Sequence, residues 1–527
     1  MSFDATSKGQ APSHISFWRA VFDQGAVTQA VIDHPYPGSG TDEDPFIITW
    51  IPDDPRNPQL SPQSRKWWIT VLVSLAALAV SLISSAYSGG LNEILENFSI
   101  SEEVAYVGIS LYVLGFAVGP VFWAPLSELY GRRWIYIISM SCLTIFTAGV
   151  VGAKNTQTLL ILRFLAGSLG SAPMAIPGGV VADLFDPVIR GLAAMLYAAA
   201  PFLGPVLGPV IGGFIAESGG WRWVQGALAL FSALLTILVT FFFPETYAPV
   251  LLRHRAARLQ KITGHIYRSA SDTSNNQPPH KKLAVALSRP WILLFREPIV
   301  FLLCTYVAVI YGILYMLFAA YPIVFQQARG WSEGLGGLAF LGILIGILTA
   351  IAYAFPVYFR YKRKSSLARQ QGHARLRPEE RLPDSFPAAV ALPVGLFWFA
   401  WTNAPTSIHY MVPIAAGVPF GFGMVMVFLP VFNYLIDTYT LYAASALAAN
   451  TMLRSVFGAV FPLFTGYMFD GLGVHWASSV PAFLSLGCAP LPFVFYFWGE
   501  RVRARSRFAG EAEAYLREST QQKASKR

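Results

Sequence analysis

Of the chain's 527 residues only 13% are charged and 54% are hydrophobic, and the formal net charge is +9. Soluble globular proteins carry roughly a quarter charged residues, so this composition excludes an ordinary soluble enzyme. Several long stretches, such as 67–92 and 298–328, contain no Asp, Glu, Lys or Arg. Because a membrane-spanning helix needs ~20 apolar residues, each stretch is long enough to cross a bilayer.

In chain order, the apolar runs predict twelve membrane helices in two groups of six. Backbone polar groups in lipid must be satisfied within each segment, and these runs lack the alternation of barrel strands, so helix is the expected structure. The runs are 67–90, 104–126, 134–153, 158–182, 191–215 and 222–243, then 297–322, 335–358, 387–402, 410–436, 440–466 and 476–498. We therefore expect an all-α integral membrane protein with six-helix bundles at 67–243 and 297–498.

Three segments lie outside the predicted bundles. Residues 1–66 are rich in Pro, Asp and Ser and lack a signal peptide, which indicates a flexible cytoplasmic tail. The linker 244–296 carries basic residues at helical spacing and then a polar stretch, 269–279, which favours a helix on the membrane surface followed by a loose tether. The basic residues are Arg253, Arg255, Arg258 and Lys261. We expect residues 499–527 to form a cytoplasmic C-terminal tail.

The distribution of Lys and Arg predicts that both termini are cytoplasmic. With that orientation, the basic residues in outer loops are only Lys154, Arg222 and Arg329. Basic residues stay on the cytoplasmic side of a membrane protein, so this asymmetry favours the orientation. The positive charge then lies near the anionic inner leaflet, and no nucleic-acid partner is expected. The first outer loop carries a glycosylation sequon at Asn97.

The three cysteines all lie in apolar spans, where small core residues are expected; they are Cys142, Cys304 and Cys488. The sequence offers neither a disulfide framework nor the spacing of metal ligands. It also lacks a Walker-type phosphate loop, which disfavours an ATP-driven pump. We therefore expect no metal and no cofactor.

A charged motif, APLSELYGRRW at 124–134, stands between the second and third spans on the predicted inner side. Glu128 precedes Arg132 by four residues, and Gly131 and Arg133 flank that arginine. An acid is stabilised at a helix N-terminus and an arginine pairs with carboxylates, so the motif predicts a latch that joins the two halves. The alternative is an ordinary charged inner loop that follows the positive-inside rule.

Arg163 lies within the predicted fourth span. An arginine at membrane depth is costly unless it is paired or hydrated, so it marks a functional interior. It stands about a turn and a half from the outer end of the span, counted at 3.6 residues per turn. Snorkelling to the membrane surface is therefore the alternative.

The fifth span contains GPVLGPVIGG at 204–213. Its glycines Gly204, Gly208 and Gly212 fall on one helix face and permit close backbone approach, and Gly213 ends the motif. Two prolines, Pro205 and Pro209, remove helix hydrogen bonds and introduce bend points. The pattern predicts a kinked helix at a rocking interface, with generic packing of small residues as the alternative.

These motifs resemble those of the major facilitator superfamily. The inner loop resembles its G-x-L-a-D-r-x-G-R-R motif, with Ala124 in place of the first glycine and Glu128 in place of the aspartate. Arg163 opens RFLAGSLGSAP, which is similar to the R-x-x-x-G signature of proton-coupled members. The fifth span resembles the antiporter signature g-x-x-x-G-P-x-x-G-G, which is associated with drug and metabolite exporters.

Four longer stretches narrow the resemblance to fungal drug:proton antiporters with twelve spans. They lie at 44–59, 244–259, 297–340 and 434–464, and the likeness covers about residues 44–509. It implies two halves around a central cavity that opens alternately inward and outward. It also implies a monomer in the plasma membrane, with the vacuolar membrane as the alternative, that exports drugs, toxins or a self-made metabolite in exchange for protons.

The substrate is expected to contact polar and aromatic side chains of the second half. Rings with polar tips suit planar amphipathic molecules. Asn450 and Arg454 lie one turn apart on an apolar helix, and both are costly to leave facing lipid. Structural pairing with the other half is the alternative for these two. The candidate substrate-binding residues are Tyr311, Tyr315, Asn433, Asn450 and Arg454.

The residue that carries the proton is not identified by the sequence, because no Asp or Glu lies deep within a predicted span. One candidate is Arg163 with a water network, and another is Asp183, near the inner end of the fourth span. A third possibility is competition elsewhere between a cationic substrate and a proton.

Two other functions compete with export. A polyamine or nutrient carrier of the same fold would favour several acids in the cavity, and those are missing. An integral membrane enzyme such as an acyltransferase would need His, Asp or Ser clustered near a membrane face. The outer-loop histidines His409 and His475 have no acid at a useful spacing except Asp470.

Overall fold

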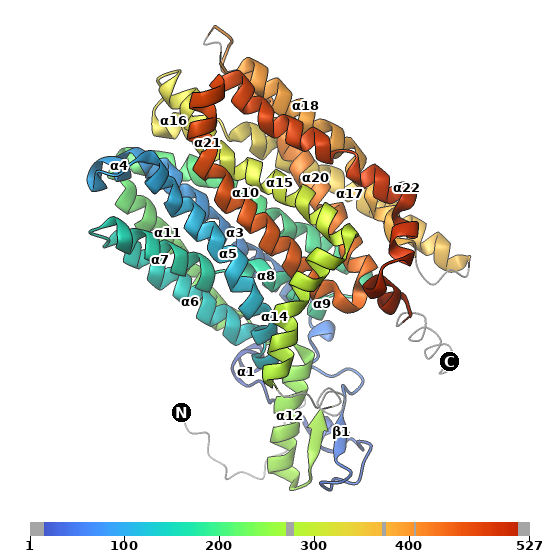
Figure 1. The fold of residues 1–527 in the computed structure, drawn as a ribbon. Helices are drawn as coiled ribbons and strands as arrows, with labels where there is room; N and C mark the ends of the chain where they lie inside the picture. The colour runs from blue at the N-terminus through green and yellow to red at the C-terminus, as the bar shows by residue number, and fades with distance from the viewer. Residues whose placement is uncertain (1–14, 270–278, 372–375, 405–406, 515–527) are drawn as a thin grey trace.

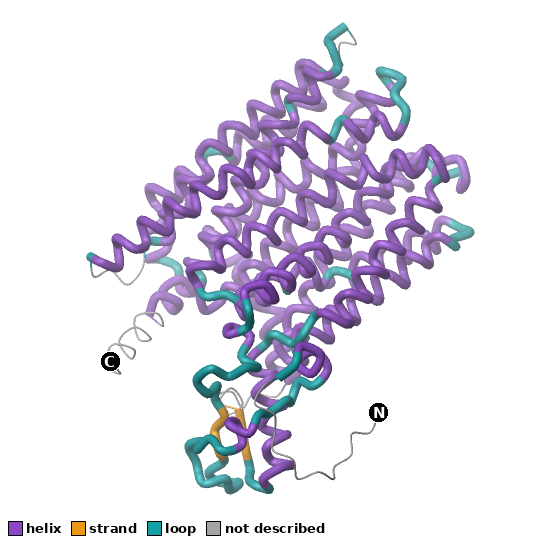
Figure 2. Tube along the Cα trace, turned by 180° about the vertical axis from the view of Figure 1, so that it is seen from behind, coloured by secondary structure: helices purple, strands orange, loops and turns teal. Residues whose placement is uncertain are grey.

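The computed structural model describes residues 15–269, 279–371, 376–404 and 407–514. Long helices pack side by side into one bundle, and two short strands lie in a smaller unit that projects from one end of it (Figures 1 and 2). We call that end the inner end. Large apolar side chains such as Phe122, Ile145 and Phe497 are exposed on the outside of the bundle, as expected of a surface that faces lipid. The predicted all-α membrane architecture is confirmed.

The first half of the bundle begins with α3 (Gln63–Ala86), which continues through the 3-10 turn η2 (Tyr87–Gly90) into α4 (Leu91–Phe98). The other long helices of this half are α5 (Glu102–Tyr130), α6 (Arg132–Val151), α10 (Pro187–Gly219) and α11 (Trp221–Phe242). Their sequences are apolar over most of their length, which is why they form helices that satisfy their own backbone within lipid.

The fourth span, predicted at 158–182, is interrupted. It consists of α7 (Thr156–Leu169), α8 (Ala172–Ala175) and α9 (Pro177–Leu184). Pro173 and Pro177 stand in the first turn of the second and third pieces. Proline has no N–H to donate to a preceding turn but fits the first turn of a new helix, so each proline restarts the helix.

The second half contains α15 (Pro298–Tyr321) with the π-turn η3 (Pro322–Gln327), α16 (Glu333–Leu338), α17 (Leu341–Gln370), η4 (Pro378–Ser385), α18 (Phe386–Thr402), α19 (Met411–Ala415), α20 (Gly417–Thr438), η5 (Thr440–Tyr442), α21 (Ala443–Cys488) and α22 (Leu491–Ala504). The predicted spans 440–466 and 476–498 are separated at Gly473, where the two helices that make up α21 meet at a kink, and the second span continues after Cys488 into α22. Gly473 has φ 73° and ψ 162°, a conformation that glycine adopts without a steric penalty.

Ten segments among the described residues are long and apolar enough to cross a membrane. The last, Thr440–Ala504, has 65 residues, enough for two crossings of ~20 residues each. The apolar helix α7 has 14 residues and reaches across only together with the pieces that follow it. These segments fit the predicted count of twelve, which stays a prediction.

The tail and the linker form a folded unit at the inner end. Strand β1 (Phe46–Ile48) pairs in parallel with β2 (Tyr267–Ser269), and the helices of this unit are α1 (Phe17–Phe22), α2 (Gln29–Ile32), the 3-10 turn η1 (Pro58–Leu60) and α12 (Ala248–Thr263). Asp54 accepts hydrogen bonds from Arg255 at 2.5 and 3.0 Å, and both side chains are buried. The prediction of a flexible tail is therefore wrong for residues 15–66, and residues 1–14 lie outside the described residues.

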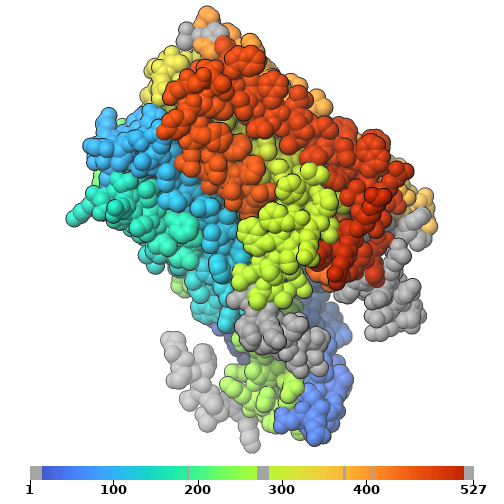
Figure 3. All heavy atoms as spheres, in the orientation of Figure 1, coloured from blue at the N-terminus to red at the C-terminus, as the bar shows by residue number. Residues whose placement is uncertain are grey.

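The predicted helix in the linker is present as α12, but it projects away from the bundle beside the tail (Figures 1 and 3). Arg255 is buried against the tail, whereas Arg253, Arg258 and Lys261 are exposed. The basic residues therefore do not form one face that lies on the membrane. A second linker helix, α14 (Pro279–Arg296), was not predicted, and the expected tether falls largely on residues 270–278, outside the described residues.

Helices α5 and α10 of the first half make the main contacts with the second half. Helix α5 packs against α21, and α10 packs against α16 and α17. Figure 3 shows α21, in orange, running beside α5, in blue, on one face of the molecule. Inside the halves, α3 packs against α10 and α15 against α21. Side chains on these helices therefore occupy the interior between the halves.

Candidate functional site

The inner loop motif forms the start of α6, where Glu245 caps the helix. Its carboxylate accepts the backbone N–H of Arg132 at 2.9 Å and of Arg133 at 3.1 Å, and also those of the two residues that follow it in the chain. A carboxylate in this position satisfies free N–H groups and interacts favourably with the helix dipole. Gly131 has φ 97°, and a Cβ there would overlap the Glu245 carboxylate, so the motif requires glycine.

The Arg132 side chain reaches across the inner end of the first half. Its Nε lies 3.4 Å from Oδ2 of Asp183 in α9, its Nη1 donates to Ser127 at 2.6 Å, and its guanidinium stacks over Tyr247. The Thr246 hydroxyl also lies 3.4 Å from Oδ2 of Asp183, so this carboxylate has two polar partners at the inner end.

Arg133 and Glu128, the other charged residues of the motif, form no contact among the described residues of the kind that the predicted latch requires. Arg133 donates to the carbonyls of Phe243 at 3.0 Å and Thr240 at 2.9 Å, at the end of α11. Glu128 is exposed, and its side chain forms no hydrogen bond or ion pair within the described part of the chain. The hydrogen bonds and ion pairs of Arg132 and Arg133 in that part all stay in the first half and the start of the linker. The latch between the halves is therefore not engaged in this structure.

The glycines of the fifth span pack against α3 in the same half. A Cβ at Gly204 or Gly208 would overlap the hydroxyl of Ser81 or Ser85, and one at Gly212 would overlap a backbone carbonyl of α3. The three positions share a face, as predicted. Pro205 and Pro209 lie inside α10, together with Pro201.

At the opposite, outer end α10 touches the second half directly. A Cβ at Gly213 would lie 2.6 Å from the Glu333 carbonyl oxygen, and the Gly334 N–H donates to Glu217 at 2.8 Å. Backbones of the two halves thus approach closely at the outer end, while the inner latch is open. Such an arrangement is closed on the outer side.

Arg163 is enclosed by three helices. It is 1% exposed, its Nε donates to the Gly108 carbonyl at 2.7 Å and its Nη2 to the Ser84 carbonyl at 3.0 Å. The rings of Tyr87 and Tyr112 lie 4.2 and 4.9 Å from its guanidinium carbon. Snorkelling is therefore wrong for this residue, because its charge is held in the interior.

The two sequence candidates for proton coupling are not brought together. Arg163 bonds to α3 and α5, whereas Asp183 bonds to Arg132 and Thr246 at the inner end. Within the described structure they share no hydrogen-bonding partner, so they belong to two separate clusters.

A chain of hydroxyl groups connects the surroundings of Arg163 to the second half. The Ser84 hydroxyl lies 2.7 Å from the Tyr315 hydroxyl, which lies 3.4 Å from that of Tyr311. The Tyr311 ring lies 5.1 Å from the guanidinium carbon of Arg454. This chain, which we call the interface chain, crosses from α3 to α15 and ends at α21.

Arg454 and Asn450 form the second-half end of this cluster. Arg454 is 3% exposed, and its Nε and Nη1 are buried without a hydrogen-bond partner among the described residues, as is Oδ1 of Asn450. The ring of Phe428 lies 5.3 Å from the Arg454 guanidinium carbon and 4.9 Å from the ring of Phe202 in α10. Four of the five predicted substrate residues meet here, whereas Asn433 donates to a carbonyl one turn back in its own helix, at 3.0 Å.

Sequence reasoning missed three residues of these clusters. Glu245 lies in a stretch used only for the family resemblance, and its capping of α6 depends on a contact between residues more than a hundred positions apart. Ser84 and Phe202 carry no signal, because a serine or phenylalanine in an apolar helix is usually an ordinary packing residue.

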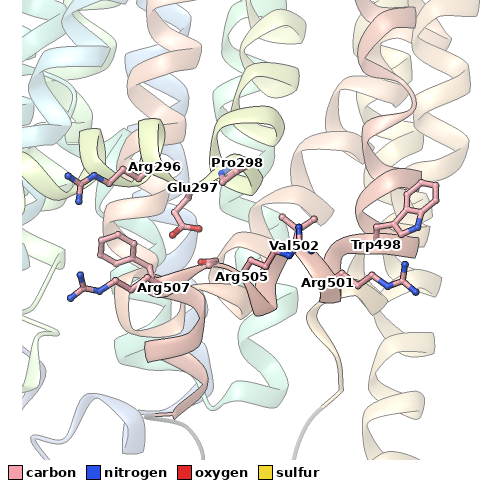
Figure 4. Close-up of a pocket in the computed structure, with 10 residues that line it drawn as sticks. Arg296, Glu297, Pro298, Trp498, Arg501, Val502, Arg505 and Arg507 are labelled. Atoms are coloured by element: carbon pink, nitrogen blue, oxygen red, sulfur yellow. The ribbon is translucent and has the colours of Figure 1, made fainter.

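A separate cavity of about 780 Å³ lies at the inner end of the second half. Figure 4 shows Glu297 there among arginines from α14, α22 and the segment after α22. Glu297 accepts a hydrogen bond from Tyr439 at 2.9 Å. Pro298 begins α15 and Tyr311 lies 13 residues on, about 20 Å along the helix axis, so this cavity is distinct from the interface chain.

The remaining predicted features are placed as follows. Asn97 is exposed in the last turn of α4, where its glycosylation stays a prediction. The three cysteines are free thiols. Within the described ranges, no group of three or more His, Cys, Asp or Glu side chains has an arrangement that could hold a metal ion.

Comparisons with known proteins agree on one family. The family model of the Major Facilitator Superfamily matches residues 73–462. The chain is 56% identical to the MFS-type efflux pump MFS2 of Trichophyton rubrum, over 97% of this chain and 85% of that protein. It is also 56% identical to the major facilitator superfamily multidrug transporter mdrA of Aspergillus fumigatus, over 97% and 84% of the two chains. The structure of the E. coli proton:xylose symporter XylE is similar in fold, with a TM-score of 0.59 at 17% identity, over 83% of this chain and 97% of that one.

Proposed function

The chain belongs to the major facilitator superfamily, and we propose that it exports amphipathic small molecules in exchange for protons. As a member of that superfamily it is a multi-pass membrane protein and a secondary transporter. The relatives named as an efflux pump and a multidrug transporter, each covered over most of its length, support outward transport of drugs, toxins or secondary metabolites.

The observation that carries the proposal is the interface chain. Ser84 in the first half and Tyr315 in the second half lie 2.7 Å apart through their hydroxyls, deep in the bundle. Alternating access separates the halves on one side while closing them on the other. Side chains at such an interface line the substrate path when the halves part, and they offer both hydroxyl groups and aromatic rings.

Proton exchange is proposed on two grounds. The family signature around Arg163 is the one associated with proton-coupled members, and Arg163 is buried in a network that joins three helices. Because a guanidinium stays protonated at any working pH, Arg163 organises this network rather than carrying the proton itself. Asp183 is the proposed titrating group, because its carboxylate pairs with Arg132 of the inner-loop motif.

We further propose a monomer in the plasma membrane, with the vacuolar membrane as the alternative, and with both termini in the cytoplasm. We propose no enzymatic activity, because the family and the named relatives are transporters. A polyamine carrier is disfavoured because the charges buried near the interface chain, Arg163 and Arg454, are positive and would repel a polycation.

The experiment is expression in a drug-sensitive yeast that lacks its own exporters, followed by a panel of fluorescent and toxic compounds with and without a protonophore. We expect lower accumulation of some compounds, and the protonophore should abolish the difference. Unchanged accumulation of every compound would contradict export, whereas efflux that resists the protonophore would contradict proton coupling alone. A vector without the gene and a variant at the exposed Lys154, Lys154→Gln, serve as negative and positive controls.

A further inference from the structure

Arg454, at the second-half end of the interface chain, is a charged residue whose buried N–H donors lack partners among the described residues. Its Nε and Nη1 have no hydrogen-bond acceptor, and no carboxylate in the described structure pairs with it. Arg163, beside the first-half end of the interface chain, donates both Nε and Nη2 to backbone carbonyls. A buried charge without a counter-ion is unfavourable, so its retention calls for a group that binds there during function.

The surroundings of Arg454 add no negative charge. Its guanidinium carbon lies 5.1 Å from the ring of Tyr311 and 5.3 Å from the ring of Phe428. Aromatic faces attract a cation weakly, but they supply no hydrogen-bond acceptor in the plane of the guanidinium. The buried N–H groups therefore point to an acceptor that the described part of the protein does not provide.

We propose that the exported substrate is an organic anion whose carboxylate binds Arg454 while its apolar body lies between the aromatic side chains of the two halves. This inference rests on the proposed function and names its substrate class. A planar carboxylate fits the fork of a guanidinium and can accept two parallel hydrogen bonds. A cationic substrate would face the unpaired charge of Arg454 without any acid to offset it.

The side chains around Arg454 indicate the chemistry of the rest of the substrate. Phe202 of α10 and Phe428 of α20 lie 4.9 Å apart at 75°, so rings from both halves flank the position. Asn450 lies one turn before Arg454 and has a buried carbonyl oxygen without a donor among the described residues. The substrate is thus a carboxylate with an aromatic or lipophilic body and one hydrogen-bond donor within about one helix turn, 5.4 Å, of the carboxylate.

The test uses matched sets of compounds in the exporter-deficient yeast. Three bodies, naphthalene, indole and a linear alkyl chain, are each supplied as the acetic acid, the primary amide and the methylammonium derivative. Efflux is measured with full-length wild type, Arg454→Gln, Arg454→Lys and the exposed-site control Lys154→Gln. Binding of the acids is measured on the purified proteins by thermal shift.

We expect efflux of acids but not of the matching ammonium compounds. Arg454→Gln should weaken acid binding about ten- to hundredfold, because the hydrogen bonds between the charged guanidinium and the carboxylate are lost. Arg454→Lys should retain part of the affinity, because it keeps the positive charge. Without ligand, Arg454→Gln should melt at or above the wild-type temperature, because an unpaired buried charge has been removed. A residue that only held the fold together would instead lower the melting temperature.

Each contrary result has a distinct meaning. Efflux of the amides or ammonium compounds in preference to the acids would overturn the anion proposal and leave export standing. Acid binding unchanged in Arg454→Gln would overturn the role of Arg454. If the wild type moves no compound of this set or of the wider drug panel, the proposed function itself fails, and the anion proposal fails with it.

Discussion

At the scale of single residues, the buried position of Arg163 excludes the alternative that its sequence allowed, which was snorkelling to the membrane surface. Its two directed hydrogen bonds end on carbonyls of Gly108 and Ser84, and two tyrosine rings cover its faces. A planar, five-donor guanidinium suits this geometry, whereas an ammonium group makes fewer directed bonds and stacks poorly. Arg163 thus acts by position and shape as well as by charge.

We predict that Arg163→Lys lowers protonophore-sensitive efflux and that Arg163→Ala lowers it further. Each lost hydrogen bond from a charged donor is worth about 1.5–3 kcal/mol, so both variants should also melt at lower temperature. Efflux from intact cells and melting of the purified proteins check this. If Arg163→Ala transports and melts like the wild type, the buried network has no role in coupling or in stability.

A second residue-scale prediction concerns the proposed proton carrier, Asp183, which pairs with Arg132 at the inner end. Protonation of its carboxylate would remove the attraction to Arg132, whereas Asp183→Asn does not titrate. In inside-out vesicles, the wild-type rate should change between about pH 7 and about pH 5, and the Asp183→Asn rate should change much less. Equal pH profiles for the two proteins would exclude Asp183 as the titrating group.

At the scale of elements, the packing of α10 against α3 depends on glycines, because no larger side chain fits between the two helices. Gly208 lies against the Ser85 side chain, so a larger residue must push α3 and α10 apart. Gly226 in α11 supplies a matched control, because a Cβ there has open space around it. The comparison separates the effect of packing from the general effect of replacing glycine in a helix.

We predict that Gly208→Val abolishes efflux while the protein still reaches the membrane, and that Gly226→Val retains it. Overpacking typically costs about 1–3 kcal/mol, and here it also displaces a helix that contacts the second half. Efflux and surface labelling are measured together. Normal transport by Gly208→Val at normal surface level would refute the importance of this contact.

The folded unit formed by the tail and the linker allows a second prediction at this scale, which concerns its buried ion pair. Asp54 and Arg255 pair in a buried setting, and breaking such a pair by removing one partner costs about 3–5 kcal/mol. We predict that Asp54→Asn releases the tail, which should then be cut by trypsin at sites such as Arg56 that are buried in the wild type. Glu43→Gln, at an exposed position, is the control. A tail that stays resistant to trypsin in Asp54→Asn would show that the strand pairing suffices without the ion pair.

At the scale of the whole molecule, the inner end is the end that carries the tail, the linker unit and the loop motif. We predict that this end is cytoplasmic. In a variant without native cysteines, an impermeant maleimide applied to intact cells should label Lys154→Cys and not Lys261→Cys, both of which are exposed positions. Both should react after the cells are permeabilised. Labelling of Lys261→Cys in intact cells would invert the topology.

Closure at the outer end and the open latch at the inner end together describe one state of a transport cycle. The Gly213 and Glu217 contacts to the second half hold the outer side, whereas Glu128 has no ion pair in the described structure. In the opposite state the inner ends would approach, and the latch that the sequence predicts would have a partner to bind. Its role therefore stays a prediction for that state.

The sequence by itself determined the membrane class, the family resemblance and most helix positions, because charge-free apolar runs satisfy both the helix and the bilayer. It also placed four of the five substrate candidates that meet in one cluster, since polar residues in such runs are rare. It missed the folded tail, whose order depends on pairing Asp54 with Arg255 two hundred positions away.

Only the tertiary structure decided which charges are satisfied. Arg163 and Arg454 look alike in the sequence, as single arginines inside apolar spans. In the described structure, one of them finds backbone carbonyls from two neighbouring helices, and the other finds only ring faces. Which acceptors lie beside a side chain depends on contacts between distant segments, and a local pattern of residues carries no information about those contacts.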